Sequence, residues 1–137
     1  MNRNDFQRLA RTRLQEANLL LARGYFAGAY YLCGYVIECG LKACIAKKTK
    51  AYDFPDKATV NESYQHDLSK LLKVSGLELT LKKESGRDKK LGVYWNTVKD
   101  WSEKSRYEIN KGKLAKDLYE AVSDRKHGVF QWIKLHW

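Results

Sequence analysis

The chain has 137 residues, and its 26 lysine and arginine residues outnumber its 16 aspartate and glutamate residues, giving a formal net charge of +10 at pH 7. Hydrophobic residues make up 44% of the sequence, enough for the core of one domain, and the single proline and nine glycines argue against collagen and disorder. No uncharged apolar run approaches the ~20 residues that cross a bilayer, so we do not expect an integral membrane protein.

The charge and the N-terminal sequence indicate where the protein works and what it meets. No apolar signal core is visible near the N-terminus, and we therefore expect a cytoplasmic protein. The basic residues are spread through the chain rather than gathered in a tail, which indicates a basic face. Such a face suits a polyanionic partner: nucleic acid, a nucleotide or an acidic protein.

The first predicted helix covers residues 5–23, where apolar residues recur at helical spacing on one side. Asn4 or Asp5 can cap its N-terminus, and Gly24 suits the position just past its C-terminus. Arg13 falls at the edge of the apolar side.

The second predicted helix covers residues 25–48 and is apolar nearly all round, which is typical of a central helix covered on several sides. Its three glycines predict close approach of neighbouring helices. Its one acid, Glu38, needs a partner in such surroundings, and Lys42 follows at i+4. Three arginines elsewhere in the chain are further candidate partners: Arg13, Arg106 and Arg125.

The sequence offers no metal site, and we expect neither a metal nor a cofactor. The cysteines lie in the second helix without CxxC spacing and are predicted to be buried, reduced thiols: Cys33, Cys39 and Cys44. No two of the histidines have metal-ligand spacing such as HxxxH: His66, His127 and His136.

Beyond the second helix, residues 49–65 predict a loop, and His66 and Asp67 then open a short helix that Gly76 closes. The next residues, 77–87, have no clear period, and only 77–81 could form a strand. Two further helices are predicted, over residues 88–104 and 113–137. The fold class is therefore all-α: one domain built as an up-and-down bundle of about five helices.

The last predicted helix places Arg125 inside an apolar face, between Val122 and Val129. A buried arginine must find a carboxylate or carbonyl groups, because it cannot lose its proton. Among the aromatic residues, Trp137 and Tyr107 are the only expected platforms for base stacking, and the other tryptophans are expected in the core or at an interface.

Three segments resemble HEPN domains. The run of small residues from 23 to 43, with Gly34-Tyr35, then Glu38, then Leu41-Lys42-Ala43, resembles the second helix of that family. His66-Asp67-Leu68-Ser69-Lys70-Leu71-Leu72 resembles the segment that follows, and Trp101 with Arg106-Tyr107 resembles the junction before the last helix. The resemblance implies a helical bundle that often dimerises, and that partners nucleotidyltransferases, binds nucleotides or nucleic acid, or cleaves RNA.

The RNA-cleaving members of the family carry an arginine followed four to six residues later by a histidine. Arg106 matches this arginine, but the corresponding histidine positions hold Asn110, Lys111 and Gly112. This departure favours a module without ribonuclease activity. The candidate residues for binding a nucleotide or nucleic acid are Arg106, Tyr107, Glu38, Lys42 and Arg125.

We therefore expect a non-catalytic HEPN-like homodimer that binds nucleotide or nucleic acid or assists a nucleotidyltransferase. One alternative is a toxin-like ribonuclease, in which Arg106 binds phosphate and His127 or Glu38 serves as a displaced acid or base. Another is a scaffold that binds only protein. Salt-dependent RNA binding separates the first reading from the scaffold, because phosphate contacts weaken as salt rises.

Overall fold

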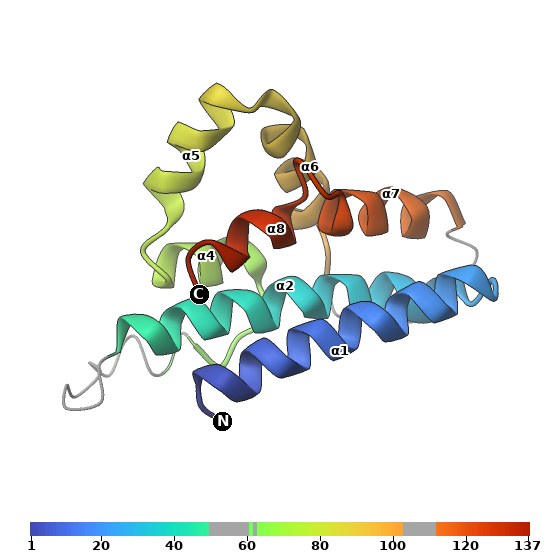
Figure 1. The fold of residues 1–137 in the computed structure, drawn as a ribbon, viewed down its shortest axis with the longest axis horizontal. Helices are drawn as coiled ribbons and strands as arrows, with labels where there is room; N and C mark the ends of the chain where they lie inside the picture. The colour runs from blue at the N-terminus through green and yellow to red at the C-terminus, as the bar shows by residue number, and fades with distance from the viewer. Residues whose placement is uncertain (50–60, 62, 103–111) are drawn as a thin grey trace.

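α1 (Arg3–Ala22) and α2 (Phe26–Lys48) form an antiparallel hairpin along one side of the molecule in the computed structural model, which describes residues 1–49, 61, 63–102 and 112–137 (Figure 1). Three helices cover α2 from the other side: α4 (Leu68–Val74), α7 (Gly112–Ser123) and α8 (Val129–Lys134). α6 (Lys89–Lys99) packs outside these three, and α5 (Glu78–Arg87) packs against α6. The described residues contain no strand, which confirms the all-α class.

Local sequence signals set the ends of the first two helices. Asn2 caps α1 in a capping box with Asp5, so the cap lies earlier than predicted. Gly24 has a φ of 80°, a left-handed conformation that favours glycine, and ends α1 where predicted. Local sequence signals therefore determine where α1 begins and where the hairpin turn lies.

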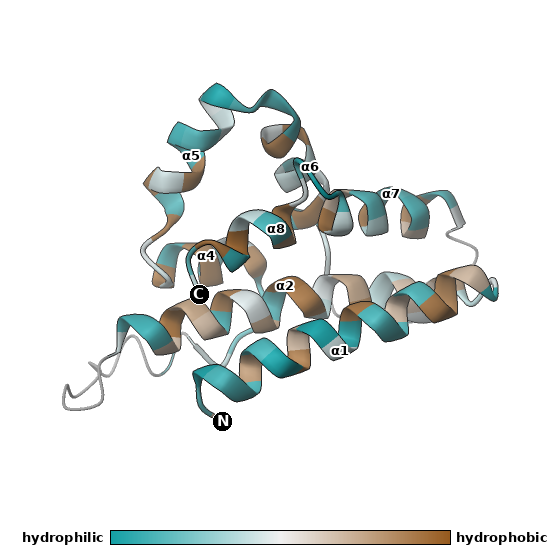
Figure 2. Ribbon diagram, viewed as in Figure 1, coloured by the Kyte–Doolittle hydropathy of each residue, from teal (hydrophilic) through white to brown (hydrophobic). Residues whose placement is uncertain are grey.

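α2 is the central helix of the fold. Twelve of its residues are buried, and it packs against α1, α4, α7 and α8. Its first turns are covered less completely: the side chains of Tyr30, Tyr31 and Tyr35 are only half-buried. Figure 2 shows hydrophobic segments along much of α2 and mainly hydrophilic residues over α5.

By length and composition, α2 is the one helix among the described residues that could cross a membrane. In this fold, 67% of its most apolar window is buried inside the protein. The central helix of a packed bundle has the same length and composition, so this property is weak support for a membrane span.

The glycines of α2 permit the predicted close approaches. A Cβ at Gly34 would lie 2.0 Å from the buried ring of Trp101, and one at Gly40 would lie 2.9 Å from Ile133 of α8. At these positions any larger residue would push a neighbour away from α2.

Two parts of the helical framework differ from the prediction. Residues 77–87 have no clear period in the sequence, yet they hold α5, and the possible strand over 77–81 does not form. The predicted last helix is two helices, since the chain turns between Ser123 and Val129. With α5 added and this helix divided, the described residues hold seven helices rather than about five.

Asp124 is the physical reason for the break. Its side chain accepts the backbone N–H of His127 at 2.8 Å, and its carbonyl accepts the N–H of Gly128 at 2.9 Å. Gly128 has extended backbone, and a Cβ there would lie 2.4 Å from the Asp124 carbonyl oxygen. The turn places Arg125 in solvent, so the expectation of a buried Arg125 is wrong.

The expected stacking platform at Trp137 is also wrong. The ring is only 8% exposed and packs edge-on against Phe130, with 5.4 Å between the ring centroids. Tyr107, like Arg106, lies outside the described residues.

Replacing Gly34 by alanine should destabilise the protein by about 2 kcal/mol, because the new methyl group overlaps the Trp101 ring. Gly86 in α5 is the control, since nothing lies within 4 Å of a Cβ there, and Gly86→Ala should be neutral or stabilising. Urea unfolding of both variants measures the difference. Equal stability of the two would show that α2 and Trp101 are not in contact.

Candidate nucleic-acid interface

Glu38 lies at the centre of α2 and is 1% exposed. The Nζ of Lys42 donates to one carboxylate oxygen at 3.2 Å, and Nδ1 of His66 lies 2.8 Å from the other. Both oxygens are therefore partnered, which compensates the cost of burying the charge. Lys42 was a predicted partner, whereas the sequence reasoning missed His66.

None of the arginines proposed as partners is shown to reach Glu38. Arg13 pairs with Glu16 on its own helix, Arg125 is exposed on the turn after α7, and Arg106 lies outside the described residues. His66 reaches Glu38 because it directly precedes Asp67, the N-cap of α4, which packs against α2. The His66-Asp67-Leu68 segment is the sequence feature that could have indicated the contact between His66 and Glu38.

The cysteines beside this centre are inert. All three are free and buried, as predicted. Burial raises the pKa of Cys33 and Cys39 to about 12 and that of Cys44 to about 11, and the charge of Glu38 adds to the rise at Cys39. The thiols therefore stay protonated and unreactive at neutral pH.

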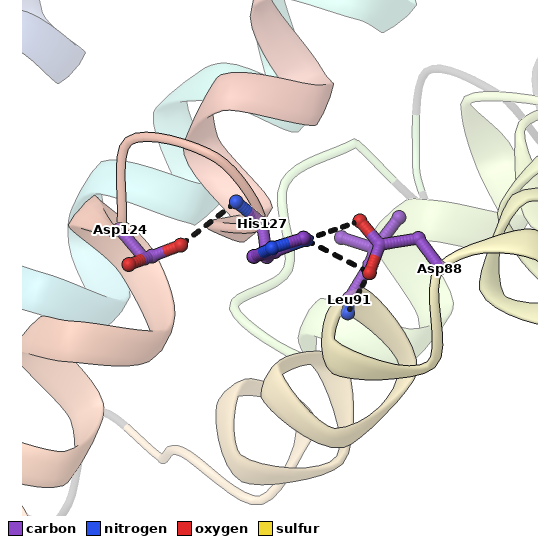
Figure 3. A network of polar contacts seen from close by, with 4 residues as sticks. All are labelled: Asp88, Leu91, Asp124 and His127. Atoms are coloured by element: carbon purple, nitrogen blue, oxygen red, sulfur yellow. Dashed lines mark hydrogen bonds and ion pairs between the residues drawn. The ribbon is translucent and has the colours of Figure 1, made fainter.

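A second histidine–carboxylate pair joins α6 to the turn after α7 (Figure 3). Nδ1 of His127 lies 2.8 and 2.9 Å from the two carboxylate oxygens of Asp88, the N-cap residue of α6. The hydrogen bond from His127 is the largest cause that lowers the pKa of Asp88, and the backbone N–H of Leu91 also donates to this carboxylate. A carboxylate at Nδ1 leaves Nε2, on the other edge of the ring, as the proton acceptor.

This pair lies in a hollow of about 310 Å³ between α5, α6 and α8. The exposed side chains of Arg125 and Lys126 line it beside His127, and Gln131 and Trp132 of α8 contribute a polar group and an apolar surface. Glu84 of α5 lines it too. Within the described residues, no group of three or more His, Cys, Asp or Glu side chains is placed to hold a metal ion.

The family model of the HEPN domain matches residues 4–136, nearly the whole chain. The chain belongs to the HEPN domain family. No curated protein and no solved structure matches it. Membership supports a function related to nucleotides or RNA in general.

In this HEPN domain the predicted site residues do not all form one centre. Glu38 and Lys42 are in contact within α2, while Arg125 lies at the separate hollow beside α8. Because the last helix is broken at Asp124, Arg125 sits next to a histidine whose ring is fixed. Periodicity in the sequence gave no sign of that arrangement.

Lys42→Ala should destabilise the HEPN domain by about 2 kcal/mol, because it removes one of the two partners of a buried carboxylate. Lys113→Ala is the matched control: it removes an i,i+4 pair of the same spacing between side chains that are 88% and 47% exposed. That loss should be under about 0.5 kcal/mol. Urea unfolding compares the two, and equal losses would contradict a buried charge at Glu38.

The Asp88–His127 contact should make stability depend on pH. Since the pKa of Asp88 is lowered in the folded state from its ordinary value of 3.8, its stabilising effect is present above that value and is lost as pH falls through the lowered pKa. Asp88→Asn keeps a capping side chain but cannot ionise. The difference in Tm between wild type and Asp88→Asn should shrink below about pH 4, and a constant difference would contradict the contact.

Proposed function

We propose that the protein is a non-catalytic HEPN module that binds nucleotide or nucleic acid at the turn between α7 and α8. The observation that carries the proposal is the exposure of Arg125 and Lys126 at the hollow beside the fixed ring of His127. A guanidinium can donate two parallel hydrogen bonds to a phosphate, and a lysine adds a point charge.

The rest of the hollow suits a nucleotide better than an acidic peptide. Its volume of about 310 Å³ is in the range of small-ligand sites, and Leu135, which is 78% exposed, gives it an apolar wall beside the nearly buried Trp132 and Leu91. Gln131 supplies both a donor and an acceptor. A base beside the phosphate-binding turn would meet apolar surface and one amide.

The sequence around Arg106 supports a module without catalysis. Since the positions four to six residues after it hold no histidine, the motif of the RNA-cleaving relatives is incomplete. A partner nucleotidyltransferase would then carry the chemistry, and this part of the proposal rests on the family resemblance.

Exposed apolar side chains support a homodimer. Val93 is 60% exposed and Leu114 is 46% exposed, and both line a groove of about 570 Å³ between α6 and α7. Leu19 and Tyr25, near the α1–α2 turn, are 64% and 65% exposed. A second copy could cover such residues, and light scattering measures the mass directly.

Arg125→Gln with Lys126→Gln should weaken binding of single-stranded RNA by about 25-fold at about 0.1 M salt, because each lost phosphate contact costs about fivefold there. Lys82→Gln with Lys83→Gln removes the same charge from two exposed residues of α5 that do not line the hollow, and it serves as the control. Fluorescence anisotropy measures the affinities. Equal losses in the two variants would assign the binding to net charge and overturn the proposal.

A second candidate function is favoured by the Asp88–His127 pair. A histidine held by a carboxylate at Nδ1 has the arrangement of a general base, and Arg125 and Lys126 stand beside it. If the protein is a ribonuclease whose general base is His127, the wild-type protein would cleave RNA and the His127→Ala variant would not. Absence of cleavage by wild type, in a preparation that binds RNA, favours the non-catalytic module.

A further inference from the structure

Four basic side chains from three helices meet where the chain reaches Trp137. They are defined here as the C-terminal basic cluster: Arg3, Arg11, Lys47 and Lys134. The main-chain oxygen of Trp137 accepts a hydrogen bond of 2.5 Å from Arg3, and the guanidinium of Arg11 lies 4.7 Å from the centre of the Trp137 ring. Helices α1, α2 and α8 therefore bring together charges that are far apart in the sequence.

Lys134 lies in the same cluster, since its Nζ is 5.0 Å from the centre of the Phe130 ring that packs against Trp137, and the charge of Lys47 acts on groups of the same region. Burial and then the charge of Arg11 lower the pKa of Lys134. Burial and then the charge of Lys47 lower the pKa of His136, which Glu84 opposes. The charges of Lys47 and Arg3 both act on the thiol of Cys44.

No acidic side chain neutralises the cluster. Within the described part of the chain, none of the four side chains forms an ion pair with an aspartate or glutamate, whereas Arg13 pairs with Glu16 and Lys113 with Asp117. Like charges held together raise the free energy of the unbound protein, and a bound polyanion would relieve the repulsion. The cluster is thus a second surface suited to phosphates.

The aromatic rings of the cluster are not open to nucleic-acid bases. Trp137 is 8% exposed and Phe130 is 2% exposed, and cations lie over both rings, with Lys134 at 5.0 Å from the centre of Phe130. Stacking needs an exposed ring face, which neither residue offers. The ring contacts instead hold Arg11 and Lys134 in place, which lowers the entropy lost on binding.

We infer that the C-terminal basic cluster binds the phosphate backbone of nucleic acid without reading its bases. The inference rests on the proposed function, and it adds a second contact surface. α8 lies between the two surfaces: Trp132 and Leu135 line the hollow, and Lys134 belongs to the cluster. A nucleic-acid strand bound at Arg125 and Lys126 can therefore run along α8, which is about 9 Å long, to reach the cluster.

The test compares the affinities of uridine, adenosine and cytidine homopolymers of about 20 nucleotides, measured by fluorescence anisotropy over a range of salt concentrations. Wild type should bind the three with affinities within about threefold of one another. Arg11→Gln with Lys134→Gln should weaken all three by about 25-fold at about 0.1 M salt, and the slope of log K against log salt should fall by about 1.4. Lys82→Gln with Lys83→Gln is the charge-matched control.

The inference would be overturned by a base preference that disappears in the cluster variant, by equal losses in the control, or by competition from polyglutamate as effective as that from RNA. Lys47→Gln is the variant of choice if the double variant unfolds, because Lys47 is exposed and forms no contact described for this fold. Lys47→Gln should lower the slope of log K against log salt by about 0.7. If the cluster variant binds RNA normally while Arg125→Gln with Lys126→Gln loses RNA binding, the inference is wrong and the proposed function is still supported.

Discussion

The burial of α2 is the constraint on which the rest of the structure depends. An apolar helix of 23 residues is unstable with its surface in water, and α1, α4, α7 and α8 cover it. The cover must also accommodate Glu38, and it does so with Lys42 from the same helix and His66 from the start of α4. The position of α4 is thereby tied to a charge as well as to apolar packing.

The surfaces proposed for binding follow from how this cover is completed. α8 closes over α2, and Ile133 meets the backbone at Gly40. The turn before α8 carries Arg125 and Lys126 outward, and the Asp88–His127 contact fixes that turn to the start of α6. The end of α8 brings Lys134 to α1 and α2. A single short helix thus sets both the hollow and the C-terminal basic cluster.

Much of the helical framework could be predicted, and most of the site could not. Apolar periodicity located α1 and α2 to within a few residues, and Asp67 and Gly76 marked the ends of the α4 segment. The break after Ser123 was missed because Val122 and Val129, two helical turns apart, remain in phase across it; only Asp124 and Gly128 signalled it. Contacts such as Arg3 with Trp137 join the ends of the chain, and no local pattern encodes them.

Hydrogen exchange in the native protein tests the central role of α2 most directly. If the other helices cover α2 as described, amides from Val36 to Ile45 should exchange slowest and only through global unfolding. Their opening free energy should then equal the free energy of unfolding measured in urea. Exchange of these amides through a local opening, at lower free energy than amides of α1 or α7, would contradict the account.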